Sequence, residues 1–421
     1  MSVQFEKDFD MEMTDLAKKK KGKRYSILWT HQAGGGSIAQ IPLIHNDVIY
    51  FGCADFYVYA VSLRGKEIWK FKTNGCVPNS TPAIKENVIY TGSYDGYMYA
   101  LNAKTGKLVW KFKTGDKICF PATIHKNVIY FGSRDGFVYA VDTEGKELWR
   151  FKTGDFVIST PTVHKDKIFV GSYDCNLYTL SLEGKELWRF KTGGVIINNN
   201  PFTIDKDIIY FGSTDSNIYA VNTETGKEIW RFKSSNGINN SLGLHKGRLY
   251  FGVEWDGNYY CIDLNGKEVW RFRTGGGIGT NHNLIHKNTV YLGCEDGNLY
   301  AIDIRTGKEK WRFKTFGPTW AGCTIYKGVI YLGSWDCHLY TIDPERGKEI
   351  WRFETSTLNQ TVEILEEEVP IELAEKKEKE EIIETDKYTI KKTTEFSDDV
   401  YITRSEYTFK SEYEKKEKHY E

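Results

Sequence analysis

Eight aspartates recur at intervals of about forty residues, and they are the most regular set of side chains here that could do acid–base chemistry. Each lies in a pattern such as Gly132-Ser133-Arg134-Asp135-Gly136, and the set is Asp55, Asp95, Asp135, Asp174, Asp215, Asp256, Asp296 and Asp336. A catalytic carboxylate is needed once per site, whereas this one returns in every repeat. Because Asp side chains cap backbone amides in turns, we predict a structural turn residue at each position.

The histidines also repeat instead of forming a catalytic or metal-binding pattern. Five of them occupy the same place, as in Ile124-His125-Lys126-Asn127, and are predicted to lie at turns: His45, His125, His164, His245 and His286. Within the repeats, His282 and His338 depart from this pattern. A single loop histidine is more often a hydrogen-bonded structural residue than a ligand or a base. Spacing supports no Ser-His-Asp or paired-carboxylate site, so we predict no catalytic residue.

The eight cysteines are scattered and include no Cys-x-x-Cys pair, which argues against a zinc site and a disulfide framework. Nothing in Met1 to Thr30 forms an apolar signal-peptide core, and no stretch is apolar enough to predict a membrane span. We therefore expect reduced thiols in a cytoplasmic protein.

Tryptophans repeat in step with the aspartates and decide the fold. Nine of them enclose eight intervals of 39 to 42 residues, in settings such as Gly145-Lys146-Glu147-Leu148-Trp149; they are Trp29, Trp69, Trp110, Trp149, Trp188, Trp230, Trp270, Trp311 and Trp351. Gly-Lys pairs follow the same period eight times. A constant period near forty residues is typical of a repeat architecture.

One repeat, residues 117 to 154, predicts four short antiparallel strands. These are Cys119 to His125, Val128 to Phe131, Phe137 to Asp142 and Glu147 to Thr153. The two middle strands are apolar on both faces, whereas the last alternates, with Trp149 and Phe151 on one face and Arg150 and Lys152 on the other. The repeats lack a 3.6-residue period, which excludes an α-solenoid. We predict an all-β, eight-bladed β-propeller of four-stranded antiparallel blades.

The unit Asn102-Ala103-Lys104-Thr105-Gly106-Lys107-Leu108-Val109-Trp110, which returns at Asn222 to Trp230, resembles the tryptophan-docking repeat of pyrroloquinoline-quinone-type (PQQ-like) propellers. The likeness covers roughly Trp29 to Thr355. That family includes quinoprotein alcohol dehydrogenases and the propeller lipoprotein of the bacterial outer-membrane assembly machinery, so the resemblance implies a fold without choosing a function. WD40 propellers are the neighbouring alternative, but their Gly-His and Trp-Asp pairs are missing from the usual places.

The resemblance also implies what a quinoprotein dehydrogenase would contain. Such an enzyme is expected to show adjacent cysteines beside the cofactor, Glu and Asn or Asp ligands for calcium, and a catalytic Asp. No Cys-Cys pair occurs in this sequence. We therefore predict no cofactor, and the sequence argues against both pyrroloquinoline quinone and calcium.

Eight complete repeats end with Trp351, yet Ser26 to His31, which contains Trp29, also has the pattern of an outer strand. The sequence therefore contains nine outer-strand patterns for eight blades. Ring closure is usually made by a strand from one terminus that joins a blade built from the other. Either Trp29 displaces Trp351 from the last blade or it adds beside it, and the full repeat match of Gly347 to Phe353 favours Trp351 in the blade.

Three regions follow from these patterns. Residues 1–24 form a basic N-terminal arm, 25–355 the propeller, and 356–421 a charged tail. The segment from Glu363 to Glu421 carries a net charge of −8, which leaves +8 on residues 1–362. Leu365 to Glu384 has the character of a helix or a linker, while Tyr388 to Lys391 and Val400 to Thr403 alternate like a polar hairpin. An isolated hairpin is marginal in water, so the tail is expected to be solvated or docked on a partner.

Information about function is expected where the repeat varies. The segments between blades and the turns before each Asp open on one face, and their residues there are amide-rich and aromatic. The candidate ligand-binding residues are Asn79, Arg134, Asn199, Asn200, Asn239, Asn240, Glu254, Trp255, Asn281, His282, Trp320 and Trp335. Amides and indoles suit a sugar-like ligand or a peptide, although Asn also supports tight loops, and the two interpretations remain open.

We predict a non-enzymatic binding module that presents this face to a protein or a small polar ligand. The alternative is an oxidoreductase or lyase with its site at the Asn-rich mouth of the central channel. The chain balances 57 Lys and Arg against 57 Asp and Glu, which gives no argument for nucleic acid as a partner. The run Lys18 to Arg24 is predicted to be a solvated terminus.

Overall fold

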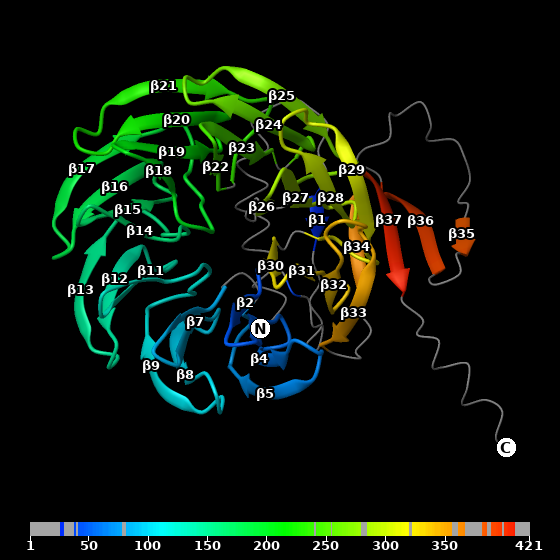
Figure 1. Ribbon diagram of the computed structural model, residues 1–421, viewed down its shortest axis with the longest axis horizontal. Helices are drawn as coiled ribbons and strands as arrows, with labels where there is room; N and C mark the ends of the chain where they lie inside the picture. Colours follow the sequence, from blue (N-terminus) through cyan, green and yellow to red (C-terminus); the bar gives the residue numbers. More distant parts are fainter. Residues whose placement is uncertain are drawn as a thin grey trace. The chain divides into compact units, whose positions relative to one another are not determined.

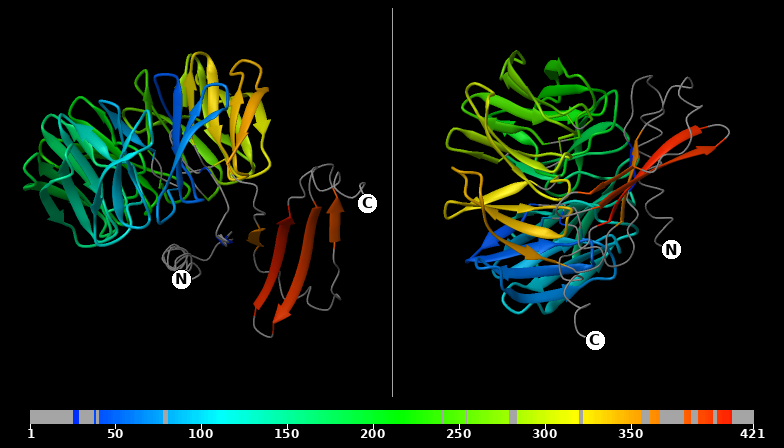
Figure 2. Two further views of the ribbon diagram at one scale, coloured as in Figure 1. Left: turned by 90° about the horizontal axis from the view of Figure 1, so that it is seen from below. Right: turned by 90° about the vertical axis from the view of Figure 1, so that its right-hand side faces the viewer.

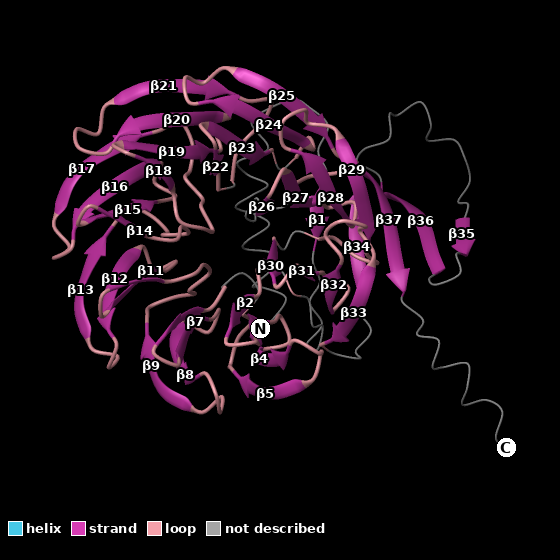
Figure 3. Cartoon of the chain, in the orientation of Figure 1, coloured by secondary structure: helices cyan, strands magenta, loops and turns pink. Residues whose placement is uncertain are grey.

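The computed structural model describes residues 26–28, 38, 41–77, 81–239, 241–253, 255–278, 284–319, 322–355, 361–366, 381–384, 389–397 and 400–408. Within these ranges every regular element is a β-strand (Figure 3). The chain divides into two compact units, one of Gly36–Thr355 and one of Met1–Gly35 with Ser356–Glu421. Over the described ranges, no helix is long and apolar enough to cross a membrane.

The larger unit is an eight-bladed β-propeller, as the repeats predict (Figures 1 and 2). Each blade is a sheet of four consecutive antiparallel strands, named A to D from the channel outward. The first four blades are β2 (Leu43–His45), β3 (Val48–Gly52), β4 (Tyr57–Ser62), β5 (Glu67–Lys72); β6 (Ala83–Lys85), β7 (Val88–Gly92), β8 (Tyr97–Asn102), β9 (Leu108–Lys113); β10 (Thr123–His125), β11 (Val128–Gly132), β12 (Phe137–Asp142), β13 (Glu147–Lys152); and β14 (Thr162–His164), β15 (Lys167–Gly171), β16 (Asn176–Ser181), β17 (Glu186–Lys191).

The other four blades repeat this order. They are β18 (Thr203–Asp205), β19 (Ile208–Ser213), β20 (Asn217–Asn222), β21 (Glu228–Lys233); β22 (Gly243–His245), β23 (Arg248–Gly252), β24 (Asn258–Asp263), β25 (Glu268–Arg273); β26 (Leu284–His286), β27 (Thr289–Gly293), β28 (Asn298–Asp303), β29 (Glu309–Lys314); and β30 (Cys323–Tyr326), β31 (Val329–Gly333), β32 (His338–Ile342), β33 (Glu349–Glu354).

Burial within a blade follows the predicted pattern except in the inner strand. In the third blade, β11 and β12 are buried on both faces, whereas β13 alternates. The inner strand begins at Thr123 and not at Cys119 as predicted, because Pro121 has no N–H for a ladder and Ile118 turns back over the blade before. A Cβ added to Gly92 would lie 2.3 Å from Ile118 Cγ2, so only glycine permits this approach.

A tryptophan of each outer strand packs on the next blade. Trp149 Nε1 donates a hydrogen bond to Leu182 O at 2.8 Å, and a Cβ on Gly184 would lie 2.6 Å from Trp149 Cδ2. The same glycine position faces a tryptophan in the other seven blades, at Gly65, Gly106, Gly145, Gly226, Gly266, Gly307 and Gly347. Buried side chains of adjacent blades, such as Tyr130 and Leu180, fill the space between the sheets. The core is therefore a ring of clusters between blades.

The ring closes through Trp351 and through a residue that precedes the first blade. Trp351 lies in β33, as predicted, and its ring contacts Gly65 of the first blade. In the third blade, Val157 of the segment between strands D and A packs on Gly132. Ile38 does the same for the last blade: its N–H donates to Ser334 O at 3.2 Å, and its side chain is fully buried. The last blade is thus completed from the other end of the chain.

The second unit contains one five-stranded sheet in its described part. Its order is β1 (Ser26–Leu28), β34 (Thr361–Glu366), β37 (Val400–Thr408), β36 (Thr389–Ser397) and β35 (Glu381–Glu384). Strand β1 pairs with β34, not with a blade, while Trp29 lies outside the described residues. Strands β36 and β37 pair antiparallel where the alternating residues predict a hairpin.

Removal of residues 1–35 should leave the propeller with a cooperative thermal transition, whereas removal of residues 1–40 should destabilise it. The longer deletion removes Ile38, and loss of a fully buried aliphatic side chain costs about 2–5 kcal/mol. Thermal and denaturant unfolding of the two truncated proteins measures the difference. Equal stabilities would contradict the closing role of Ile38.

Candidate functional site

The carboxylates of the repeated aspartates accept hydrogen bonds that hold the fold together. Asp135 Oδ1 accepts from Phe137 N at 3.0 Å, which confirms the predicted turn cap. Its Oδ2 accepts from Tyr139 Oη at 2.7 Å and from Gly115 N of the preceding blade at 2.7 Å. Asp135 therefore closes its own B–C turn, the turn between strands B and C, and ties it to the neighbouring blade. Four other carboxylates make the same bond to a backbone N–H of the preceding blade: Asp95, Asp174, Asp215 and Asp336. The bond to the neighbour was not predicted, because spacing does not reveal which blade a turn faces.

Asp256 is the exception among these turns. Among the described residues its carboxylate accepts one hydrogen bond, from Asn258 N at 3.0 Å, and Tyr260 Oη instead lies 3.0 Å from Ser235 Oγ. The residue before it, Trp255, is 39% exposed. The sixth blade therefore presents an indole to solvent beside a less constrained turn.

Titratable groups at this face are perturbed mainly by burial. Burial raises the pKa of Glu295, whose Oε2 accepts from Gly277 N at 3.1 Å. Burial lowers the pKa of His338, but the hydrogen bond and the charge of Asp336 outweigh it, and the net pKa is raised. His338 Nδ1 lies 2.8 Å from Asp336 O, so this histidine belongs to the turn. Glu295 is a half-buried carboxyl that the candidate set omits, because its turn position alone does not signal burial.

Most of the amides at the mouth hold loops together. Asn198, Asn199 and Asn239 are each at most 4% exposed. Ser241 Oγ donates to Asn198 Oδ1 at 2.5 Å, and Asn200 Nδ2 donates to Asn199 Oδ1 at 3.2 Å. This burial favours the structural interpretation for Asn199 and Asn239, and leaves Asn200 as the accessible amide of the group.

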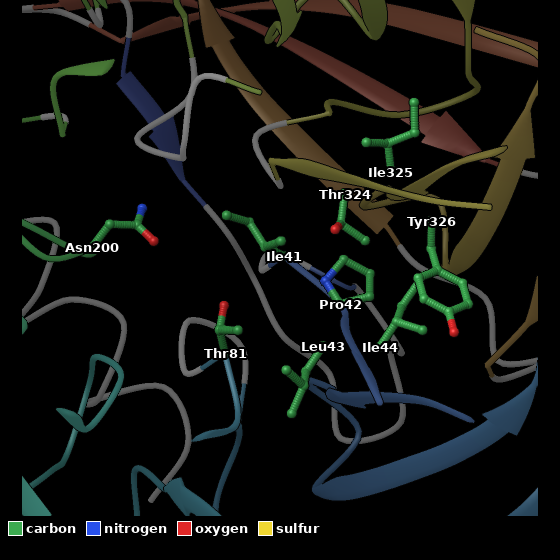
Figure 4. Close-up of a pocket in the computed structure, with 9 residues that line it drawn as sticks. All are labelled: Ile41, Pro42, Leu43, Ile44, Thr81, Asn200, Thr324, Ile325 and Tyr326. Carbon is green, nitrogen blue, oxygen red and sulfur yellow. The ribbon is translucent and has the colours of Figure 1, made fainter. Parts of the chain in front are cut away.

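Asn200 lines a cavity of about 370 Å³ in the central channel (Figure 4). The other lining residues come from the starts of the first, second and last blades: Ile41, Pro42, Leu43, Ile44, Thr81, Thr324, Ile325 and Tyr326. The volume suits a small ligand, but the lining is largely aliphatic. Its polar side chains are Thr81, Asn200, Thr324 and Tyr326. None of them is a carboxylate, so the lining does not fit a calcium ion, which proteins bind mainly through carboxylate oxygens.

The other described candidates lie apart from this cavity lining. Arg134 is 6% exposed, and its guanidinium carbon lies 4.7 Å from the centroid of the Phe156 ring. Trp335 is half-buried, and its backbone N–H donates to Pro318 O at 3.0 Å. Six candidates lie outside the described residues: Asn79, Asn240, Glu254, Asn281, His282 and Trp320. Among the described side chains, no group of three His, Cys, Asp or Glu could hold a metal ion.

Comparison with known proteins identifies the same repeat. The family model for outer membrane protein assembly factor BamB matches residues 54–143, 115–241, 180–315 and 255–376. No curated protein sequence matches the chain. Among solved structures, the computationally designed Ika8 protein is 18% identical with a TM-score of 0.63, over 75% of this chain and 98% of that chain. BamB from Moraxella catarrhalis is 17% identical with a TM-score of 0.62, over 75% of this chain and 95% of the BamB chain. At these identities the two structures show a shared fold.

Replacement of Asp135 by Asn should destabilise the propeller more than the same change at Asp256. Asp135 accepts three hydrogen bonds, and bonds to a charged acceptor are worth about 1.5–3 kcal/mol. Asp256→Asn, with its single bond, should cost less than about 1 kcal/mol. Denaturant unfolding of the two variants gives both values. A larger loss at Asp256 would show that the carboxylates do not act through these bonds.

Proposed function

Because this chain belongs to the PQQ-like β-propeller repeat family of outer membrane protein assembly factor BamB, we propose that it is a non-enzymatic interaction scaffold. The face formed by the B–C turns and the D–A segments, which join successive blades, is its partner-binding surface. The partner class favoured is a protein, and a small polar ligand is the alternative.

One observation carries this proposal. The polar groups that repeat in every blade are engaged in turns and blade contacts, as Asp135 is, whereas the residue before each Asp changes from blade to blade. Around the ring these variable positions are Ala54, Tyr94, Arg134, Tyr173, Thr214, Trp255, Glu295 and Trp335. Aromatic residues and Arg are enriched in the binding hot spots of protein interfaces. Selectivity for a partner is therefore expected from this set.

The proposal extends to cofactors and to the cellular compartment. We propose that the chain acts without pyrroloquinoline quinone or calcium, which is supported by the aliphatic lining of the channel cavity. We also propose a cytoplasmic location, which is supported by eight cysteines in the thiol form, since a reducing compartment keeps cysteines in this form. Titration of the purified chain with the quinone and calcium, followed by near-ultraviolet absorbance, tests the first point, and bound quinone would contradict it.

Trp255→Ala should weaken capture of the physiological partner by tenfold or more. Loss of an indole that acts as a hot spot at the centre of an interface removes about 2 kcal/mol or more of binding free energy, and about 1.4 kcal/mol already corresponds to tenfold. The full chain is used to capture proteins from the native host, and the dissociation constant of the captured partner is then measured for each variant. Leu148→Ala is the control, because Leu148 is also exposed, at 48%, but lies on the outer strand β13. Equal weakening by both changes would contradict the assignment of the face.

A further inference from the structure

The A–B turns, which join strands A and B at the opposite rim of the channel, carry a ring of lysines. The first turn residue has a positive φ in every blade, between 46° and 55°. In blade order these residues are Asn46, Glu86, Lys126, Lys165, Lys206, Lys246, Lys287 and Lys327. The second turn residues are Asp47, Asn87, Asn127, Asp166, Asp207, Gly247, Asn288 and Gly328. Six consecutive blades thus place an ammonium group on one rim.

Where the next turn carries an aspartate, the lysine pairs with it. Lys165 Nζ lies 2.6 Å from Asp207 Oδ1, one blade further along the ring. Lys327 Nζ lies 2.6 Å from Asp47 Oδ1 across the closure of the ring. Lys126 Nζ lies 3.9 Å from Asp166 Oδ1. The turns therefore follow one geometric rule: a lysine reaches forward to the second residue of the following turn.

The rule fails on three successive blades because the acceptor is missing from the sequence. Lys206 faces a turn with Gly247, Lys246 one with Asn288, and Lys287 one with Gly328. Among the described residues, Lys206 and Lys246 have no ion pair. Lys287 has one weak contact, to Glu345 Oε1 at 3.5 Å, in which both side chains are largely exposed. We call Lys206, Lys246 and Lys287 the unpaired arc, because none of them has an aspartate partner in the following turn.

We propose that the unpaired arc is a second binding surface, which takes an acidic peptide segment of a partner protein. Carboxylates of this segment occupy the places that Asp47, Asp166 and Asp207 occupy elsewhere on the rim. The chemistry of the ligand follows from the ring itself, since the three paired lysines all hold carboxylates. These turns contain no Trp or Phe that could stack on nucleic-acid bases, and Lys327 Nζ lies over the ring of Tyr326, 5.3 Å from its centroid.

Binding at this surface depends on several contacts at once. A single exposed ion pair is worth at most about 1 kcal/mol and is screened by salt, so one carboxylate would bind too weakly to be held. Three adjacent ammonium groups at successive turns engage three carboxylates of one extended segment. The affinity is therefore expected to fall steeply with ionic strength.

The test supplies the missing acceptors from the chain itself. In the variant Gly247→Asp/Asn288→Asp/Gly328→Asp, each lysine of the unpaired arc gains an internal partner and all lysines remain. The fold accepts these changes, because an added Cβ at Gly247 or Gly328 meets no atom within 4 Å. Their φ values of 69° and 74° are close to those of Asp47 and Asp166, 61° and 56°, at the same turn position. Asn288→Asp is also expected to be tolerated, because Asp207 is the second residue of its own A–B turn, as Asn288 is.

A fluorescent decaglutamate peptide is titrated with the full chain at low salt, and binding is followed by anisotropy. We expect the wild-type chain to bind it, and the triple-Asp variant to bind at least tenfold more weakly with an unchanged melting temperature. Lys206→Gln/Lys246→Gln/Lys287→Gln should show the same loss, which covers the case in which the first variant folds poorly. The control Lys66→Gln/Lys104→Gln/Lys146→Gln changes the net charge equally, at exposed turns between strands C and D, and should bind within twofold of wild type.

Three results would overturn the proposal. The wild-type chain could fail to bind the peptide. The control could lose as much affinity as the triple-Asp variant, which would reduce the effect to overall charge. Tighter binding of an oligothymidylate of equal charge, lost in the triple-Asp variant, would reassign the arc to phosphates. None of these results bears on Trp255, which lies in a B–C turn at the other rim, so the two surfaces are tested separately.

Discussion

The contact between one tryptophan and one glycine sets the geometry of the ring. Trp188 lies on Gly226 of the next blade, where a Cβ would come within 2.8 Å of the indole Cδ2, and its Nε1 donates to Thr223 O at 3.3 Å. The same contact, repeated at each step, fixes the spacing and the direction of successive blades. Gly226 also needs its positive φ of 66°, so the turn and the contact require the same residue. The tryptophan–glycine contact therefore also determines where the channel and the turns of both rims lie.

Much of this fold can be predicted from the sequence, because the spacing of the recurring residues gives the period of the repeat directly. The eight blades, the buried middle strands and the place of Trp351 all follow from residues that recur, and the family resemblance is confirmed. What does not recur is harder to predict. Ile38 closes the ring although no tryptophan or aspartate marks its segment, and the inner strand begins late because Pro121 and Ile118 turn the chain before it.

The candidate site is predicted less well, for a physical reason. Side-chain type and loop position cannot tell an amide that contacts solvent from one that holds a neighbouring loop. Asn199 and Asn200 are adjacent in sequence, yet one is buried and the other lines the channel cavity. The sequence does not single out Glu295, because the burial that raises its pKa is a property of the assembled ring. The deviations from the repeat are more informative, both at the B–C turns and at Gly247 and Gly328, where glycine stands at a turn position that carries Asp or Asn in the other six blades.

The central claim is that stability lies in the tryptophans that contact the next blade, while the exposed Trp255, which lies outside this set, serves binding. Equilibrium unfolding of Trp188→Ala and Trp255→Ala tests it most directly. The account predicts a loss of about 3–5 kcal/mol for Trp188→Ala, the range for removal of a large packed aromatic side chain. It predicts less than about 1 kcal/mol for Trp255→Ala, since Trp255 is a surface residue. Equal losses would place Trp255 in the packed framework and contradict the division between structural and functional positions.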